Sequence, residues 1–546
     1  MEDSACTERL SRPCVSGRVL AMVLFVLAAP LLVRPAHAVD PSTQEILDRL
    51  GTSVEARILT LSTHDMPESA FEMDMVIGVA KYINANMIFV EVLNDDGYMN
   101  YPSKVWPHRE GENDRLQMLI DRAHAQGIQV VPWIKTFFAA ANGQLGPVLE
   151  QRPEWAAVGS DGNILTSYGL AWFNPAHPEA RKFIQRAILE LVTDYDIDGL
   201  QLDYIRYPNT YPEHIPTVYS YDDYSRRAFQ KATGLDPIDL PTPTFPQLTG
   251  AGVTLESLPP EWQSWTIWRE NQIHSFLDEL TQQVRAVRPD LPLFFGVIPA
   301  LWSGTTYPYA RFLLNQHWTA WIEAGYVDGL TPPSYTEEDV VLIREVSNIR
   351  DLARTTEADG PVVIYPSLMV YPDPNTLVRQ IELLRQMGIP GFRLFTYGRM
   401  SLQHLQALHE GPFAEPALVP HDKPFMSALR LVEELQEVLY ALGGESNGLH
   451  FETLEPLLMA VQPLRERLES VAGAYREPAG MYDVRRKTGI SREAAEEMLE
   501  LVATLAETTR RLFDSPADEA VRDGVLRSLR YVQSLIEYGM MVEMRP

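Results

Sequence analysis

Between residues 57 and 412, short apolar runs alternate with longer stretches in which apolar residues have helical spacing. The runs are four to seven residues long, the length expected of strands buried on both faces of a sheet. In the second gap, Leu116, Leu119 and Ala123 fall on one helical face, and Gly127 follows at a position typical of helix ends. The predicted strands are residues 57–62, 87–93, 128–134, 197–203, 293–298, 327–331, 362–365 and 391–395.

Strands that alternate with helices form parallel sheets, because a helical crossover returns the chain to the same end of the sheet. Eight such repeats are the number that closes a barrel. The glycine fingerprint of a dinucleotide-binding fold is absent after the first predicted strand. The pattern therefore predicts a (β/α)8 TIM barrel, with an open doubly wound sheet as the alternative.

The connection between the fourth and fifth predicted strands is a long insertion of some 90 residues. It contains several tyrosines and a proline-rich stretch at residues 237–260. Long loops inside compact domains are usually functional, and a loop that follows a barrel strand lies on the catalytic face. We expect this insertion to border the functional site.

Beyond residue 412 the strand pattern stops. Four prolines fall between residues 412 and 424, a density typical of a linker or a stiff strap. Phe425, Leu429, Val432 and Leu435 then have helical spacing, and Ser515-Pro516 resembles a helix start. We predict four or five helices over residues 425–543, packed as a bundle or against the barrel.

The N-terminus resembles a secretory signal. Three arginines precede an apolar run at residues 19–33, and Ala36-His37-Ala38 follows as a cleavage site. The run is short for a membrane span and contains Pro30; an uncleaved anchor is the alternative. The predicted organisation is a signal peptide at 1–38, a barrel at 39–412, a proline-rich linker at 413–424 and a helical C-terminal domain at 425–546.

Composition limits the chemistry further. Both cysteines, Cys6 and Cys14, precede the predicted cut, so the mature chain would have no disulfide, no thiolate nucleophile and no cysteine-bound metal. The net charge of −27 repels nucleic-acid phosphates and anionic lipid. We therefore expect a secreted or periplasmic protein that binds no nucleic acid and is not inserted in a membrane after signal cleavage.

The most informative stretch is residues 195–208, around the fourth predicted strand. Residues of a barrel strand alternate between the helix layer and the interior. With Leu200 and Leu202 facing the helices, Gln201 and Asp203 point inward, and Asp203 stands at the carboxyl end, where barrel enzymes place catalytic groups. The alternative is that Asp203 forms a structural ion pair with Arg206.

This stretch resembles the fourth-strand signature of the glycosyl-hydrolase-like family 10 barrels, and the resemblance extends over about residues 55–400. Further matching motifs occur in order: Tyr101-Pro102-Ser103, Trp172-Phe173-Asn174-Pro175, Pro178-Glu179, Trp268-Arg269 with Asn271, residues 318–328, and Pro333-Ser334-Tyr335. The resemblance implies a TIM barrel that acts on carbohydrate, similar to enzymes of cell-wall or matrix glycans. The end of the second strand departs from the family pattern. The family usually has an Arg there, whereas four of residues 91–96 in this chain have acidic or amide side chains.

Glycosidases place two carboxyl groups at the scissile bond, one protonated and one ionised. Asp203 is the predicted ionised partner, as nucleophile or as base. Glu337 follows the sixth strand and is the predicted acid, although it could equally be an acidic residue of a first helical turn. Asp95 and Asp96, after the second strand, are further candidates.

Aromatic side chains near strand ends are a second signal, because they stack on the apolar faces of sugars. Lys135 could bind an anionic substituent or form a salt bridge. The predicted substrate-binding residues, from strand ends and from the family resemblance, are Asn94, Asp95, Trp133, Lys135, Trp172, Asn174, Tyr204, Arg206, Arg269, Trp302, Tyr335 and Tyr397. His64-Asp65 lacks a third ligand at a suitable spacing, so we predict no metal and no cofactor.

The sequence therefore predicts a glycoside hydrolase of an extracytoplasmic polysaccharide or peptidoglycan-type glycan. A non-catalytic glycan-binding barrel is the alternative, since a barrel can lose its acid and keep its cleft. A third possibility is a scaffold in which the C-terminal helices bind a protein partner.

Overall fold

The structure is a computed structural model. It describes residues 41–109, 113–208, 215–299, 307–356, 361–443, 449–476 and 486–545. The predicted signal peptide at 1–38 and Trp302 lie outside the described residues. The described residues belong to one compact unit.

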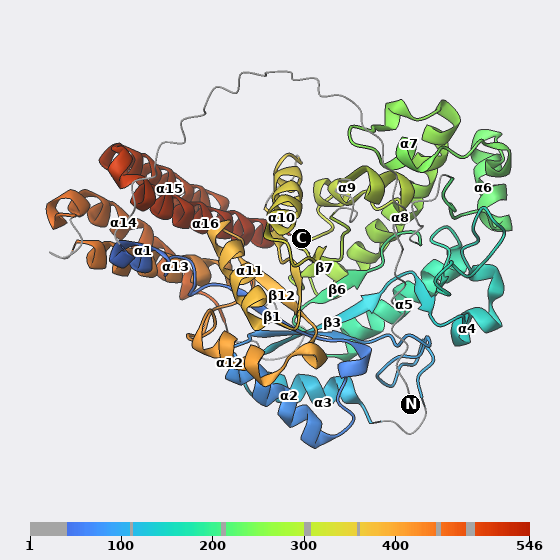
Figure 1. Ribbon diagram of the computed structural model, residues 1–546, viewed down its shortest axis with the longest axis horizontal. Coiled ribbons are helices and arrows are strands. Elements are labelled where there is room, and N and C mark those ends of the chain that lie inside the picture. The colour runs from blue at the N-terminus through green and yellow to red at the C-terminus, as the bar shows by residue number, and fades with distance from the viewer. Residues whose placement is uncertain are drawn as a thin grey trace, which may run out of the picture. The chain divides into compact units, whose positions relative to one another are not determined.

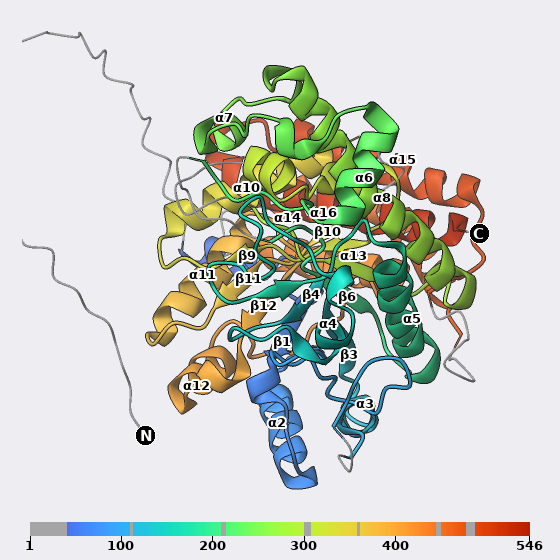
Figure 2. The ribbon, with the colours of Figure 1, turned by 90° about the vertical axis from the view of Figure 1, so that its right-hand side faces the viewer.

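Parallel strands close into a barrel with helices around it (Figure 2). The strands are β1 Ala56–Leu61, β2 Met87–Glu91, β3 Gln129–Lys135, β6 Leu200–Asp203, β7 Leu293–Phe295, β8 Gly329–Leu330, β9 Pro333–Ser334, β10 Val363–Ile364, β11 Ser367–Met369 and β12 Gly391–Phe395. β12 pairs with β1 on one side and with β11 on the other, while β10 pairs with β8 and β11 with β9. The predicted (β/α)8 barrel is confirmed, and the open sheet is wrong.

The sixth and seventh barrel strands each consist of two short pieces, β8 with β9 and β10 with β11. Pro332 and Pro366 stand at the interruptions, where a residue without an N–H removes a ladder hydrogen bond. The ladder nevertheless continues, because Tyr365 N donates to Leu330 O and Ser367 N donates to Pro332 O. The barrel ring is therefore complete at these strands.

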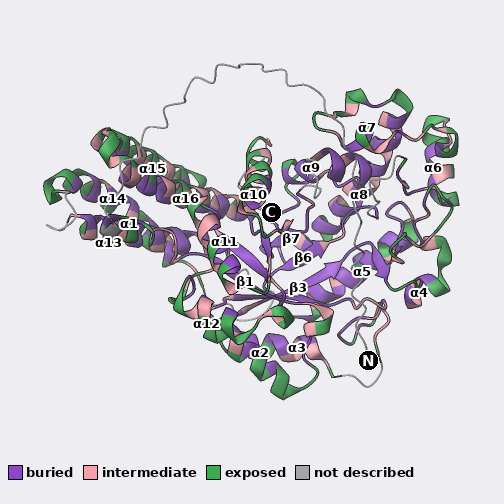
Figure 3. Ribbon diagram, in the orientation of Figure 1, coloured by how far each residue is buried: buried purple, intermediate pink, exposed green. Residues whose placement is uncertain are grey.

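Helices cover the outside of the barrel, and their inner faces are buried (Figure 3). They are α2 Ala70–Tyr82, α3 Arg115–His124, α5 Pro178–Asp194, α8 Pro260–Val287, α9 Trp318–Glu323, α10 Asp339–Arg354, α11 Pro374–Gln386 and α12 Leu402–Glu410. In α3 the Asp114 side chain accepts from Gln117 N and so caps the helix, and Leu116 and Leu119 are fully buried. Gly127 has φ +71° just after this helix, as its predicted end requires.

Two connections on the carboxyl side of the strands carry extra structure. Between β3 and α5 lie β4 Phe138–Ala140, paired antiparallel with β5 Ala171–Trp172, and α4 Gly146–Gln151. The long insertion before α8 contains α6 Asp223–Thr233 and α7 Phe245–Thr249, and it has its own apolar core built on Phe229, Leu248, Trp262 and Trp265. Single turns occur at Thr63–Asp65, Pro153–Trp155, Pro237–Asp239, Leu255–Ser257, Tyr309–Leu313, Tyr397–Arg399 and Pro516–Asp518.

Four long helices account for most of the described residues after 423, and they lie side by side (Figure 1). They are α13 Pro424–Leu442, α14 Phe451–Ala472, α15 Arg492–Leu512 and α16 Glu519–Met544. Their apolar faces form a separate core, which α1 Pro41–Leu47 joins through Leu47. The bundle contacts the amino-terminal ends of the barrel strands: Arg545 pairs with Asp328, and Tyr531 donates to Val54 O.

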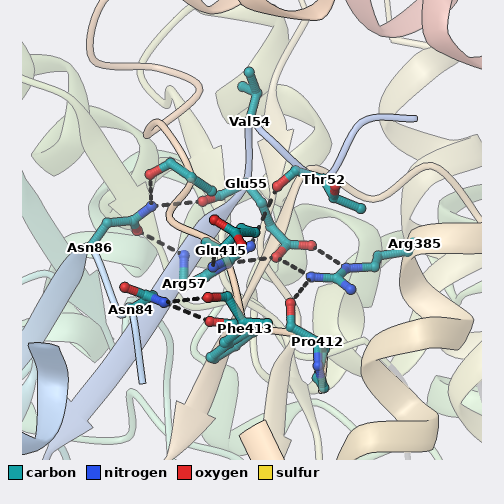
Figure 4. A network of polar contacts seen from close by, with 12 residues as sticks. Thr52, Val54, Glu55, Arg57, Asn84, Asn86, Arg385, Pro412, Phe413 and Glu415 are labelled. Atoms are coloured by element: carbon teal, nitrogen blue, oxygen red, sulfur yellow. Dashed lines mark hydrogen bonds and ion pairs between the residues drawn. The ribbon is translucent and has the colours of Figure 1, made fainter. Parts of the chain in front are cut away.

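The proline-rich segment is bonded to the barrel at this same end (Figure 4). Buried Arg57 of β1 donates from Nη1 to Glu415 O at 2.5 Å and from Nε to Glu55 at 2.9 Å. Arg385 donates hydrogen bonds both to the Glu55 carboxylate and to Pro412 O. Asn86 Nδ2 donates to Ala417 O at 2.9 Å. Residues 412–418 thus form a strap held by backbone carbonyls rather than a free linker.

Candidate active site

A buried polar layer crosses the interior of the barrel below its carboxyl end. Arg393 Nε of β12 donates to Thr60 Oγ1 at 2.8 Å, and its Nη1 donates to Gln201 Oε1 at 2.9 Å. Gln201 Nε2 in turn donates to Thr331 Oγ1 at 2.8 Å. Gln201 therefore points inward as predicted, and Asp203, two positions further along β6, lies on the same side of the strand.

Asp203 is held at the mouth of the barrel by two hydrogen-bond donors. Trp133 Nε1 donates to Oδ2 at 3.1 Å, and the backbone N–H of Tyr204 donates to Oδ1 at 2.7 Å. Gly296 faces the carboxylate so closely that a Cβ there would come within 2.6 Å of Asp203 Cγ. A side chain at position 296 would therefore displace the carboxylate.

The structural alternative for Asp203, an ion pair with Arg206, does not form among the described residues. Arg206 is buried, donates to Tyr207 O at 3.1 Å, and lies over the rings of Trp172 and Tyr204 at 4.9 and 4.7 Å. Burial lowers the pKa of Arg206, while the charges of Tyr204 and Asp203 act in the opposite direction. Arg206 thus supports the aromatic wall beside Asp203.

Tyr204 has an unusual backbone. Its φ is +53°, a left-handed conformation that costs a non-glycine residue of order 1–3 kcal/mol. This conformation turns the ring away from the strand, where it packs against Trp172 at 5.1 Å and Phe138 at 5.8 Å. Burial raises the pKa of Tyr204, and the charge of Asp203 adds to that rise, so the phenol stays protonated.

Lys135 ends β3 and forms a buried charge cluster. Its Nζ lies 2.7 Å from Glu91 Oε1 and 2.7 Å from Asp95 Oδ1, and it stacks over Phe138 at 4.2 Å. Burial alone would lower the pKa of Lys135, but Glu91 and Asp95 together raise it. The second oxygen of Glu91 accepts from Thr63 N at 2.9 Å, so both oxygens have partners.

Aromatic rings surround the same mouth. Phe395 lies 6.1 Å from Trp133 and 5.1 Å from Tyr335, and Tyr335 is 38% exposed. The Arg393 guanidinium lies 4.4 Å from the Trp133 ring. Burial lowers the pKa of Arg393, and the charges of Tyr335, Asp203 and Glu91 oppose this. Glu91, Asp203, Tyr335 and Arg393 come from or directly follow four different strands. Their mutual influence therefore shows that the ends of β2, β6, β9 and β12 converge at the mouth.

Several predicted substrate-binding residues lie elsewhere. Asn174 is fully buried, with Nδ2 donating to Ser225 Oγ at 3.0 Å and Oδ1 accepting from Ala176 N at 2.9 Å. Arg269 is fully buried against Trp262 and Trp265 within the core of the insertion. Neither side chain is exposed in this structure, and contact of these two residues with substrate stays a prediction.

The remaining predicted residues have intermediate positions. Trp172 is 1% exposed and lies behind Tyr204, so it supports the wall rather than offering a surface. Asn94 is half-buried and its backbone closes a turn with Tyr98, and Tyr397 is half-buried near Asp65 after β12. Glu337 is exposed, just before α10.

Sequence reasoning did not select Glu91, Arg393 or Phe395. The alternation of side chains along a strand could have identified them. Met87, Phe89 and Glu91 lie on one side of the strand, and the first two are in the barrel core, so Glu91 points inward as well. The same alternation joins Arg393 to Phe395.

The described residues contain no group of three or more His, Cys, Asp or Glu that could hold a metal ion. Among the described helices, none has the length and apolar character needed to cross a membrane.

The structure is a closed (β/α)8 barrel with a carboxylate at the carboxyl end of its fourth strand, on the face where barrel enzymes place their active sites. The chain belongs to the family described as Glycosyl hydrolase-like 10, whose model matches residues 58–381, more than half of the chain. The predicted family is confirmed.

The chain is similar to two curated relatives. It is 23% identical over 278 residues to the glycosyl hydrolase DigH of Escherichia coli, covering 46% of this chain and 55% of that protein. It is 23% identical over 342 residues to the glycosyl hydrolase YngK of Bacillus subtilis, covering 56% and 58%. The chain therefore spans little more than half the length of these relatives.

Solved structures with a similar arrangement include the α-L-fucosidase isoenzyme 2 of Paenibacillus thiaminolyticus, with TM-score 0.45 and 14% identity over 66% of this chain and 49% of that one. Another is the β-amylase catalytic domain of Paenibacillus polymyxa, with TM-score 0.45 and 12% identity over 64% and 95%.

Proposed function

We propose that the protein is a glycoside hydrolase that cleaves O-glycosidic bonds of an extracytoplasmic polysaccharide or peptidoglycan-type glycan. The observation that carries this proposal is Asp203, a partly exposed carboxylate at the mouth of the barrel that accepts hydrogen bonds from Trp133 and Tyr204. Membership of the Glycosyl hydrolase-like 10 family supports the reaction class.

Asp203 acts as the ionised carboxylate. Hydrogen-bond donors to both of its oxygens fix the direction of the carboxylate. A carboxylate so held can attack the anomeric carbon or activate a water molecule, as retaining and inverting glycosidases respectively require.

Glu337 acts as the acid that protonates the leaving oxygen. It follows Tyr335 at the carboxyl end of the sixth strand and is exposed to solvent. Glu91 is less suitable, because Lys135 and Thr63 occupy both of its oxygens and neither is available to donate a proton. Glu91 and Lys135 instead form a buried ion pair near Asp203.

Sugar rings bind against the exposed aromatic surface. Tyr335 and Phe395 offer ring faces, and Trp133 borders the carboxylate. Such surfaces pack on the C–H faces of sugars, while Asn94 and Asp95 supply polar contacts. We further propose export through residues 1–38, which an intact mass of the exported protein starting near Val39 would support.

A second candidate function is glycan binding without hydrolysis. It is favoured by one observation: Glu91, an inward carboxylate two strands away from Asp203, has both oxygens occupied. A barrel without an effective acid would keep the aromatic surface and bind sugar without cleaving it.

The test compares wild type, Asp203→Asn and Glu337→Gln on a panel of glycans, with products identified by mass spectrometry. Glu338→Gln is the matched control, since Glu338 is the next exposed acid in the chain. The proposal expects cleavage by wild type and by the control, and a loss on the order of 10³-fold in Asp203→Asn. Binding without products from wild type would establish the glycan binder, and full activity of Asp203→Asn would remove Asp203 from the mechanism.

A further inference from the structure

A cavity of about 990 Å³ lies at the opposite end of the barrel from Asp203. One wall is formed by the C-terminal ends of α10 and α11 and by the residues that lead into β10 and β12, and the other wall is formed by α16. Asp203 stands at the carboxyl end of its strand, whereas this cavity lies where strands begin. The volume is at the upper end of those that hold organic ligands.

Four arginines line this cavity, which we call the Arg cavity. Arg350 and Arg354 come from α10, and Arg527 and Arg530 come from α16. Among the described residues of the lining there are two acids, Asp523 and Glu537, so this part of the wall carries a net positive charge in a chain whose total charge is −27. A local excess of cations in an acidic protein calls for a specific explanation.

Two of the arginines have a structural role. Arg350 donates to Met387 O at 3.1 Å, and Arg527 donates to Gln386 O at 3.0 Å. These carbonyls end α11, where unsatisfied acceptors and the helix dipole favour cations. This role accounts for Arg350 and Arg527 but not for the other two arginines.

Arg354 and Arg530 remain without such partners. Both side chains are exposed, and among the described residues neither guanidinium has a carboxylate oxygen within 4.0 Å or a hydrogen-bond acceptor from the protein. Partial burial lowers the pKa of Arg354, and repulsion by Arg350 and Arg530 lowers it further, against the opposing effect of Asp351.

The acids of the cavity do not neutralise these arginines. Asp523 pairs with Arg522 at 3.2 Å, and Glu537 accepts from Gln533 Nε2 at 2.8 Å. Arg354 and Arg530 therefore line one cavity, close enough for their charges to repel, and guanidinium groups are well suited to bind phosphate and carboxylate.

We propose that the Arg cavity binds an organic phosphate ester. A phosphate dianion can pair with Arg354 and Arg530 at once, which a monocarboxylate cannot do as fully. The organic part would contact the apolar lining, which includes Val362, Ile364 and Leu535, and the rings of Tyr531 and Tyr538. A phosphorylated sugar or polyol and a small aromatic phosphate share this chemistry.

The experiment is isothermal titration of the full chain with phenyl phosphate, which carries a dianion on an apolar body. Saturable binding of one ligand per chain is expected. Arg354→Gln and Arg530→Gln, measured singly, should each weaken binding by about tenfold or more, because each removes a charge-assisted hydrogen bond. Arg510→Gln, an exposed arginine of α15 outside the cavity, should bind as wild type does.

Further titrations distinguish the sources of the phosphate. Glycerol phosphate binding more tightly than phenyl phosphate indicates a polyol or sugar ester, and the reverse order indicates an apolar ester; benzoate should bind more weakly than either. Circular dichroism of each variant verifies its fold. Asp203→Asn should bind phenyl phosphate as wild type does, so this test is independent of glycosidase activity.

Three results would overturn the proposal. They are absence of saturable binding to wild type, equal affinity in folded Arg354→Gln and Arg530→Gln, and loss of binding in Asp203→Asn, which would move the ligand to the barrel mouth.

Discussion

Trp133 Nε1 donates a hydrogen bond of 3.1 Å to Asp203 Oδ2, joining the ends of two adjacent barrel strands. The indole ring lies 4.4 Å from the Arg393 guanidinium, so one aromatic side chain contacts both the carboxylate and a buried cation. Trp133 is only 6% exposed, which restricts its movement. The direction of the Asp203 carboxylate therefore depends on the packing of this ring.

Trp133→Phe keeps an aromatic ring and removes the N–H donor. We expect kcat/KM on a cleaved glycan to fall by about tenfold, the effect of one hydrogen bond to a charged group. In the background of Asp203→Asn the same change should have little further effect, because the two residues act as a unit. Equal losses in both backgrounds would show that Trp133 acts independently of Asp203.

Lys135→Met removes the cation between two carboxylates. Lys135 is 3% exposed and Glu91 is 5% exposed, so the change leaves a buried charge without its partner. Breaking such a pair costs roughly 3–5 kcal/mol in the free energy of unfolding. Urea unfolding monitored by circular dichroism measures this quantity.

Adding Glu91→Gln to Lys135→Met should recover a large part of that loss, because the buried negative charge is then absent as well. If the double variant is less stable than Lys135→Met, the ion pair is not the cause of the destabilisation.

Glu345 of α10 should make stability depend on pH. Burial raises its pKa to about 7, against a weaker opposing effect of Arg344. Between pH 4.5 and 7 the unfolded chain releases this proton while the folded protein keeps it, so the free energy of unfolding falls as pH rises. The total is up to ~3 kcal/mol, since one unit of pKa corresponds to about 1.4 kcal/mol.

Glu345→Gln removes the titrating group and should flatten this slope. The gain in stability over wild type should grow from pH 5 to pH 8, as measured by urea unfolding at each pH. Glu466→Gln, an exposed residue of α14, is the control and should leave the slope unchanged. A constant difference between Glu345→Gln and wild type would show that Glu345 does not titrate in this range.

The number and order of the barrel strands could be predicted from the sequence, because each short apolar run is buried on both faces. The extent of the sixth and seventh strands could not be predicted, because Pro332 and Pro366 indicate strand ends. In the fold the ladder continues through the carbonyls of both prolines, as Ser367 N and Arg393 N donate to them.

The site was less predictable than the fold. Alternation placed Asp203 correctly, since Leu200 and Leu202 define the opposite face of β6. Asn174 and Arg269 were chosen by resemblance, and a linear motif does not show whether a side chain faces a cleft or the core of an insertion. Glu91 and Arg393 were missed because their importance depends on strands that meet only when the barrel closes.

The C-terminal helices should stabilise the barrel through Arg545. This residue pairs with Asp328, which is fully buried at the start of the sixth strand and also accepts from Leu293 N at 2.9 Å. Arg545→Met keeps the apolar stem and leaves the Asp328 charge without a cation, so we expect a loss of roughly 3–5 kcal/mol. Because this pair joins the bundle to the barrel, the two parts of the wild-type protein should unfold in one transition.

Calorimetry and urea unfolding measure this effect, with Arg510→Met as the control for an exposed arginine. Asp328→Asn combined with Arg545→Met should be more stable than Arg545→Met alone, because the uncompensated charge is removed. An unchanged melting temperature in Arg545→Met would show that the ion pair contributes nothing. In the wild-type protein, a separate early transition of the helices would show that the bundle does not stabilise the barrel, since coupling through Asp328 requires both parts to unfold together.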